Sequence, residues 1–200
     1  MKNILVVGSG AREVAIARCI SQSSIKNSIF CVSKEKNPQI VDLCKDYFVT
    51  DVTNISGIVL YSRKNKIDLA IIGPENPLAN GIVNELEGVG VRCVGPKKEV
   101  ALIETSKSFA RKIIDLCCPE KNPKRKEFGS IDGVEGFIKQ LGGEYVIKFD
   151  GLMGGKGVRV SGEHLKNIDE GVAYANEIIK IGGKFLVEEK LVGEEFSLIK

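Results

Sequence analysis

The sequence predicts a parallel α/β domain followed by a smaller α+β unit, and three observations lead to this fold class. Short apolar runs alternate with segments of helical periodicity over residues 1–96, a pattern typical of a parallel sheet covered by crossover helices. The runs are apolar throughout, as expected for strands buried on both faces. Later in the chain, two strand-like runs flank a glycine-rich turn, which indicates an antiparallel hairpin.

The elements of the first domain follow from its apolar runs and from the residues that end them. Glycine and proline interrupt regular structure, and Gly73-Pro74 ends one such run. Ile55, Ile58 and Val59 have the spacing of one helix face. We expect strands at residues 4–7, 29–32, 47–49, 69–72 and 91–94, and helices after Gly10, at residues 55–63 and at residues 78–86.

The second unit is expected to combine helices with an antiparallel sheet. The basic stretch of residues 121–126 contains Pro123 and follows Pro119, so we interpret it as a loop first and a binding patch second. We expect a helix over residues 97–117 that breaks near Thr105-Ser106, helices at residues 137–141 and 165–181, and strands at residues 145–149, 158–160 and 185–188.

Composition narrows the class of protein. The chain has 200 residues, 43% of them hydrophobic, and a net charge of +3. This balance argues against disorder and against nucleic-acid binding. Six cysteines without a C-x-x-C pair indicate free thiols in a reducing compartment, and a single histidine, His164, argues against a zinc cluster. The start of the chain resembles no signal peptide and no run is long enough to span a bilayer, so we expect a cytoplasmic protein.

Two loops of the first domain are candidate ligand sites. Residues 8–13 (GSGARE) lie between a strand and a helix, where backbone N–H groups and the helix dipole favour anions. A dinucleotide site fits poorly, because Glu13 stands where the third fingerprint glycine would fall and the second strand ends in Ser33-Lys34. Residues 73–78 (GPENPL) follow another strand, and Glu75 and Asn76 could bind sugar hydroxyls. For each loop, a purely structural turn remains an alternative.

A third candidate site lies in the second unit. Residues 150–157 (DGLMGGKG) form a glycine-rich connection whose N–H groups and Lys156 could close over phosphates. It is no Walker loop, because no Ser or Thr follows the lysine. Lys148 lies on the preceding strand, where we favour a phosphate contact over a surface role. Residues 185–195 form a strand that runs into an acidic turn, for which a solvated turn is the simpler interpretation.

Together these stretches resemble the phosphoribosylamine–glycine ligases, and the resemblance covers essentially the whole chain. Each motif alone is weak, but five occur in the family's order. Residues 36–38 and 162–165 look most like the archaeal branch. The matching stretches are residues 8–15 (G-x-G-[GA]-R-E-H-A), 73–78 (G-P-E-x-P-L), 95–107 (G-P…E-x-S-K), 148–158 (K-x-D-G-L-x-x-G-K-G-V) and 188–197 (E-E-x-L-x-G-E-E-x-S).

The resemblance implies a Rossmann-like domain of the pre-ATP-grasp type followed by an incomplete ATP-grasp domain. Val14 replaces the motif's histidine, and Phe149 replaces an alanine or proline and is expected to crowd the nucleotide side. The chain ends before the lobe that supplies the family's magnesium ligands, so we expect no metal site within it. The implied divisions are residues 1–96 (Rossmann-like domain), 97–121 (helical linker), 122–186 (small ATP-grasp lobe) and 187–200 (start of the next lobe).

The resemblance also implies an activity. The parent reaction joins glycine to 5-phosphoribosylamine with ATP and Mg²⁺ (or Mn²⁺) in purine biosynthesis, through a glycyl phosphate. The implied partners are these small molecules, with no nucleic acid, no membrane and a monomeric state. ATP is assigned to Lys107, Lys148, Gly151, Gly154, Gly155, Lys156, Gly157, Glu188, Glu189, Leu191, Glu194 and Glu195, and phosphoribosylamine to Gly8, Gly10, Arg12, Glu13, Gly73, Pro74 and Glu75.

Other functions remain open at this stage. A nucleotide- or phosphosugar-binding module without catalysis is compatible with a chain that stops early. Another ATP-grasp carboxylate ligase, such as a biotin carboxylase-like enzyme, is disfavoured by the motifs at residues 73–78 and 104–107. An NAD-dependent oxidoreductase is disfavoured by Glu13 and Lys34.

Overall fold

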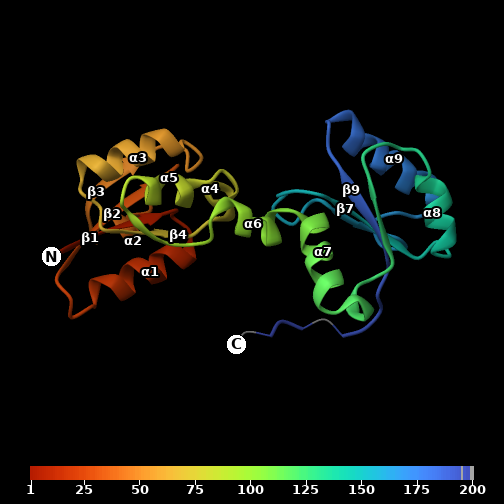
Figure 1. The fold of residues 1–200 in the computed structure, drawn as a ribbon, viewed down its shortest axis with the longest axis horizontal. Helices are drawn as coiled ribbons and strands as arrows, with labels where there is room; N and C mark the ends of the chain where they lie inside the picture. The colour runs from red at the N-terminus through yellow and green to blue at the C-terminus, as the bar shows by residue number, and fades with distance from the viewer. Residues whose placement is uncertain (195, 199–200) are drawn as a thin grey trace. The chain divides into compact units, whose positions relative to one another are not determined.

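The computed structural model describes residues 1–194 and 196–198. The chain forms two compact units, Met1–Leu102 and Ile103–Lys200; in Figure 1 the first contains β1 to β5 (residues 2–94) and the second contains α7 to α9 (residues 107–180) with its own sheet. None of the helices in the described part of the chain is both long and apolar enough to cross a membrane. The two-unit organisation agrees with the predicted fold class.

The first unit contains a parallel five-stranded sheet. Its strand order is β3-β2-β1-β4-β5, and every neighbouring pair is parallel. The chain therefore builds outward from β1 in one direction and then in the other, so the order reverses between β1 and β4. Such a switch point is where open α/β sheets bind ligands. The strands are β1 (Lys2–Val7), β2 (Asn27–Ser33), β3 (Cys44–Val49), β4 (Leu69–Ile72) and β5 (Arg92–Val94).

Helices cover both faces of this sheet (Figure 1). One core packs Ile58 and Leu86 of two helices against Leu5 and Phe30 of the strands. A smaller core on the other face joins Val14, Ala17 and Ile40 to Cys31. Because both faces of the sheet are buried, its strands contain runs of consecutive apolar residues and do not alternate between apolar and polar ones. The helices are α1 (Ala11–Ser21), α2 (Pro38–Val41), α3 (Ile55–Lys64), α4 (Glu75–Ala79) and α5 (Ile82–Gly88).

Two predictions for the first unit were wrong or incomplete. The single helix predicted at residues 78–86 is two helices, because Gly81 adopts φ 81° between them, a left-handed conformation that glycine tolerates best. Helix α2 was not predicted. It is one turn long, begins with Pro38, and is capped by the Asn37 side chain, which accepts a hydrogen bond from the Gln39 N–H.

The second unit contains an antiparallel four-stranded sheet of order β6-β9-β7-β8. Its core packs Val134, Ile138 and Ile178 of two helices against one face of the sheet, where Tyr145 and Ile147 lie. The predicted hairpin is confirmed as β7 paired with β8. The strands are β6 (Arg125–Phe128), β7 (Tyr145–Phe149), β8 (Val158–Val160) and β9 (Phe185–Glu189). The helices from residue 98 onward are α6 (Lys98–Thr105), α7 (Lys107–Cys117), the 3-10 turn η1 (Pro119–Lys121), α8 (Val134–Gln140) and α9 (Ile168–Lys180).

In this region, capping residues determine where the helices begin. The predicted break at Thr105-Ser106 is confirmed, because the Ser106 side chain accepts a hydrogen bond from the Phe109 N–H and starts α7. Helix α9 begins at Ile168 rather than residue 165, because Asn167 caps it. The loop predicted for residues 121–126 is confirmed only for residues 122–124, because Lys121 ends η1 and Arg125 and Lys126 begin strand β6, which pairs with β9.

Candidate functional site

The loops that follow β1 and β4 lie at the switch point of the parallel sheet. The Gly73 N–H donates to the Val7 carbonyl, which fastens the second loop to the end of β1. The Arg12 guanidinium donates to the Gly73 carbonyl oxygen. Chain segments about sixty residues apart in the sequence therefore meet at one edge. The seven residues predicted for this site lie in these two loops or in the first turns of the helices that follow them, α1 and α4: Gly8, Gly10, Arg12, Glu13, Gly73, Pro74 and Glu75.

The buried side chain of Glu13 lies between the two loops. Its Oε2 accepts a hydrogen bond from the Gly10 N–H at 2.6 Å. A Cβ on Gly73 would lie 1.9 Å from Glu13 Oε1, and one on Gly8 would lie 2.9 Å from Glu13 Cδ. Glycine at both positions thus makes room for the carboxylate. This packing is structural, and contact with a substrate stays a prediction.

Asn37, which the sequence analysis did not select as a site residue, joins a third loop to this edge. Its Nδ2 donates to the Ser9 carbonyl at 2.8 Å, while its Oδ1 caps α2. The amide therefore fixes the glycine loop from the β2 side. A lone Asn-Pro pair signals a helix start, but nothing in the sequence indicates the Ser9 contact.

In the second unit, Asp150 anchors the start of the glycine loop to the first turn of α7. Its carboxylate accepts hydrogen bonds from the Ser108 Oγ at 2.5 Å and the Ser106 Oγ at 3.2 Å. Lys107, between the two serines, donates through Nζ to the Gly151 carbonyl at 3.1 Å. Lys107 thus lies beside the loop, and its contact with phosphate stays a prediction.

The tip of the glycine loop projects away from the sheet. Gly154 and Gly155 have φ 54° and 79°, and a Cβ on either would meet nothing within 4 Å. Lys156 is exposed and its N–H closes a turn on the Met153 carbonyl at 3.0 Å. Gly157 is buried at the start of β8, where a Cβ would lie 3.0 Å from Met153. The tip of the loop is thus open to solvent, whereas its two ends are packed.

The Phe149 side chain lies on the core face of its strand and also approaches the glycine loop, where a Cβ on Gly151 would lie 2.7 Å from its ring, so its effect on a nucleotide stays a prediction. It packs against the core shared with α8 and α9, and a Cβ on Gly183 would lie 2.6 Å from its ring. Side chains alternate across a strand, so Lys148 lies on the opposite face of the sheet. In Figure 1, α7 lies on one side of β7 and β9, and α8 and α9 lie on the other.

A hollow of about 580 Å³ lies on the Lys148 face of this sheet, within the usual size range of ligand pockets. Strand register places Val146 opposite Glu188 and Lys148 opposite Val158. The hollow therefore gathers predicted site residues from two strands and the segment after β9. Its lining is Arg111, Val146, Lys148, Val158, Val160, Glu188, Glu189, Leu191, Val192, Gly193 and Glu194. Glu195 lies outside the described residues.

Three charged side chains form the floor of the hollow. Glu188 is only 2% exposed. Arg111 binds it with two hydrogen bonds, Nε to Oε1 at 2.6 Å and Nη2 to Oε2 at 2.8 Å, and Lys148 Nζ lies 2.7 Å from Oε2. Burial raises the pKa of Glu188, but the two cations outweigh it and hold that pKa below its usual value. The trio carries a formal charge of +1.

The acids predicted at the base and ribose have other contacts. The Glu188 carboxylate is engaged by the two cations, so any contact with a base would use its backbone. Glu189 Oε1 accepts a hydrogen bond from the Lys124 N–H at 2.8 Å. Leu191 and Glu194 are exposed at the rim of the hollow. Arg111 was missed, although it follows Lys107 by one helical turn and so shares its face of α7.

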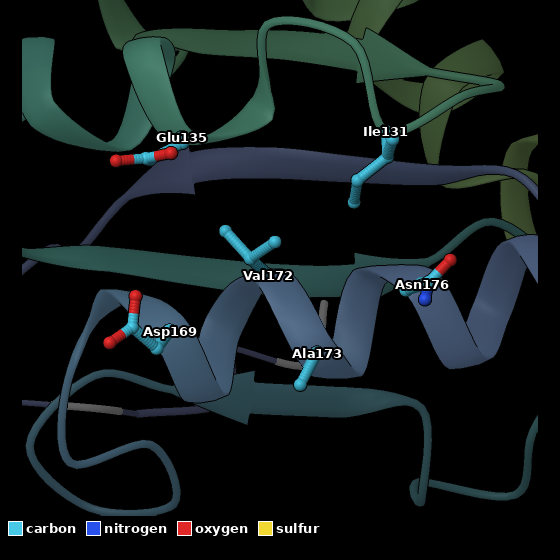
Figure 2. A pocket seen from close by; sticks show the side chains of 6 residues that line it. All are labelled: Ile131, Glu135, Asp169, Val172, Ala173 and Asn176. Atoms are coloured by element: carbon cyan, nitrogen blue, oxygen red, sulfur yellow. The ribbon is translucent and has the colours of Figure 1, made fainter.

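A second hollow, of about 340 Å³, lies on the helical side of the unit (Figure 2). Val172 and Asp169 come from α9, and Glu135 comes from α8, where it pairs with Lys139 at 2.6 Å. Figure 2 shows these side chains spread along the helices rather than directed at one point. None of the predicted site residues lines it, so we assign the candidate site to the Lys148 face.

Solved structures share this fold. A phosphoribosylamine–glycine ligase from Thermotoga maritima matches with a TM-score of 0.73 and 21% identity, over 96% of this chain and 44% of that one. An ADP complex of N5-carboxyaminoimidazole ribonucleotide synthetase matches with a TM-score of 0.70 and 18% identity, over 96% and 47%. Each of the two units thus shares its fold with the matching part of these enzymes.

Sequence relatives are closer. The profile of the phosphoribosylglycinamide synthetase N domain matches residues 2–104, and that of the ATP-grasp (A) domain of the same synthetase matches residues 105–200. The chain belongs to this family. Phosphoribosylamine–glycine ligases from Methanococcoides burtonii and Thermococcus kodakarensis are 40% and 43% identical over 98% and 97% of this chain. The chain spans 45% and 44% of their lengths.

Proposed function

We propose that the protein takes part in joining glycine to 5-phosphoribosylamine with cleavage of ATP to ADP and phosphate, in purine biosynthesis. The observation that carries this proposal is the hollow on the Lys148 face, where a trio of charge +1 lies beside a glycine-rich hairpin loop. A triphosphate needs this combination of cations and free N–H groups. Membership of the family and the names of its relatives support the choice of substrates.

In this proposal, ATP lies in the hollow with its phosphates toward α7. Lys107 and Lys148 bind phosphate oxygens, and Lys156 joins them when the loop closes. The loop N–H groups of Gly151, Gly154, Gly155 and Gly157 supply further hydrogen bonds. The segment after β9 binds the nucleoside, with Glu188, Glu189 and Leu191 at the adenine and Glu194 and Glu195 at the ribose.

Phosphoribosylamine is assigned to the switch point of the first unit. Backbone N–H groups of Gly8 and Gly10 precede α1, whose N-terminus favours a phosphate. Arg12 adds a positive charge, and Glu75 offers a carboxylate to sugar hydroxyls. Buried Glu13, with Gly73 and Pro74, holds these loops in place. We also propose that the protein acts as a monomer in the cytoplasm, without nucleic-acid or membrane partners.

The chemistry requires two displacements. A glycine carboxylate oxygen attacks the γ-phosphorus, the bond from that phosphorus to the β–γ bridging oxygen breaks, and ADP leaves. The phosphoribosylamine nitrogen then attacks the acyl carbon, loses a proton, and expels phosphate. Phosphoryl transfer depends mainly on positioning and charge stabilisation, so no nucleophile from the chain is assigned.

Mg²⁺ or Mn²⁺ would neutralise phosphate charge in this reaction. Such ions take oxygen ligands, usually one or two carboxylates together with substrate phosphates. Glu188 does not fit this role, because both of its oxygens are bound by Arg111 and one also by Lys148. We therefore propose that the metal ligands lie outside residues 1–200, and we derive no step through the metal.

Oxygen transfer tests the proposal in the protein at its natural length. Glycine labelled with ¹⁸O in its carboxylate should deliver one label per turnover to the released phosphate, and ADP release should require both glycine and phosphoribosylamine. Unlabelled phosphate would exclude the acyl phosphate. ATP binding without turnover would favour a binding module, and turnover with another carboxylate would favour a different ATP-grasp ligase.

A further inference from the structure

Arg111 contacts the proposed nucleotide site without belonging to any of the motifs that identify it. It lies one turn after Lys107 in α7, on the same face of the helix. Its guanidinium binds both oxygens of Glu188, at 2.6 and 2.8 Å. This fork fixes the plane of the carboxylate more firmly than a single point charge would.

The arrangement leaves one positive charge in excess. Glu188 is 2% exposed, whereas the side chains of Arg111 and Lys148 are 23% and 25% exposed. The carboxylate is therefore covered, and both cations reach the surface of the hollow. If Arg111 were absent, Lys148 and Glu188 would sum to zero. The carboxylate would then offset the attraction of Lys148 for an anion, since like and opposite charges this close act strongly in a partly buried site.

We propose that Arg111 is a positioning residue of the nucleotide site, which holds Glu188 so that the Lys148 ammonium keeps its positive charge toward a triphosphate. This inference rests on the proposed function, because it assumes that ATP occupies the hollow. Arg111 alone engages both oxygens of Glu188, so the carboxylate has a charged partner at each oxygen without Lys148. Lys148 is therefore the cation whose charge remains for an anionic ligand.

Binding of ATP and of adenosine, compared by calorimetry in the protein at its natural length, separates charge from structure. Arg111→Met should weaken ATP binding by about tenfold or more, because the Glu188 carboxylate then offsets the charge of Lys148, and leave adenosine binding nearly unchanged. Arg111→Lys should recover part of the ATP affinity. Lys112→Met is the matched control, because Lys112 is the next residue of α7 and its side chain is 62% exposed beside Glu127.

A double variant gives a second test, whose result does not depend on how well the single variant Arg111→Met folds. Adding Glu188→Gln to Arg111→Met removes the negative charge, so Lys148 is again unopposed and ATP affinity should rise relative to Arg111→Met alone. An equal loss of ATP and adenosine affinity in Arg111→Met, or no rescue by Glu188→Gln, would overturn the role of Arg111 while leaving the nucleotide site intact. Failure of the unchanged protein to bind either ligand would instead overturn the proposed function and this inference with it.

Discussion

The carboxylate of Asp150 binds Ser108 twice, accepting from its Oγ at 2.5 Å and from its backbone N–H at 3.2 Å. These residues are 42 positions apart, so the contact ties the glycine loop to the first turn of α7. A carboxylate is favourable at this place, because the N-terminus of a helix carries unpaired N–H groups and a positive dipole end. The glycine loop and Lys107 are thereby held in a fixed relation.

Loss of the contact between Asp150 and Ser108 should make both the glycine loop and the first turn of α7 more flexible. We expect Asp150→Ala to lower the free energy of unfolding by about 1–3 kcal/mol, as for removal of one charged hydrogen-bond partner. Amide exchange should accelerate at residues 106–110 and 150–157. Hydrogen exchange with mass spectrometry measures both segments, and Asp132→Asn in an exposed turn is the control. Unchanged exchange at residues 106–110 would show that Asp150 does not anchor α7.

Lys148 is expected to bind phosphate directly. A charge-assisted hydrogen bond contributes about 1.5–3 kcal/mol, so Lys148→Met should weaken ATP binding at least about tenfold in the protein at its natural length. The fold should survive, because Arg111 still binds Glu188. Exposed Lys166 provides the control Lys166→Met. ATP kinetics that do not change in Lys148→Met would place the phosphates elsewhere.

Glu188 should make stability depend on pH in the acid range. Its folded pKa lies below its usual value, so the unfolded chain binds the proton more tightly. The stabilisation is therefore present above the unfolded pKa of about 4.3 and is lost as the pH falls through the folded pKa. Glu188→Gln should destabilise the unit by about 3–5 kcal/mol at pH 7.

The same variant separates this effect from a general packing defect. The difference between wild type and Glu188→Gln, measured by urea unfolding, should shrink as the pH falls below about 4, because the wild-type carboxylate then becomes neutral. Glu120→Gln, at an exposed position, should show no such change. A difference that is constant from pH 7 to pH 3 would mean that the charge of Glu188 contributes nothing.

Strands that begin and end at glycine or at polar turn residues could be predicted from the sequence, and strands without such residues at their ends could not. The bounds of β4, β7 and β8 were predicted to the residue, because apolar runs there end at glycine or polar turns. Strand β6 was missed because only Phe128 of its four residues is buried, so no apolar run marks it. It forms through backbone pairing with β9, which depends on residues 60 positions away and leaves no local signal.

The residues of the candidate site could likewise be predicted only in part from the sequence. Glycines and lysines at 148–157 have a recognisable spacing, and the structure brings Lys107 and Lys148 to the same unit. Arg111 and Asn37 could not be predicted as site residues, because their partners, Glu188 and Ser9, lie 77 and 28 residues away. A side chain that acts through a distant partner is defined by the fold and not by its sequence neighbours.

NAD and NADP should not bind the first unit. Dinucleotide sites place an acid after the second strand for the ribose, but β2 ends in Ser33, whose Oγ lies 2.6 Å from the Tyr47 hydroxyl. Glu13 also fills the space between Gly8 and Gly73. Titration calorimetry with either cofactor should give no measurable heat of binding. Micromolar affinity that is lost on substitution of Gly10 would contradict this interpretation of the loop.

Residues 1–200 alone should have no ligase activity and should bind ATP only weakly. The chain spans 45% of the length of the relative from Methanococcoides burtonii, and the proposed metal ligands lie outside it. The apolar residues near the end of the sequence predict an exposed apolar surface around Phe185, Leu191 and Phe196. That expectation was wrong for Phe185, which is fully buried in the core, whereas Leu191, Val192, Phe196 and Leu198 are 69–91% exposed.

Such an apolar segment should make residues 1–200 prone to association. We expect concentration-dependent self-association by analytical ultracentrifugation, and no ADP release that depends on glycine and phosphoribosylamine. Replacing Leu191 and Val192 by serine should reduce association without restoring activity, because the substitutions remove apolar surface and supply no metal ligand. Turnover by residues 1–200 at the rate of a complete family member would show that the metal ligands lie within this chain, and the proposed division of the site would then be wrong.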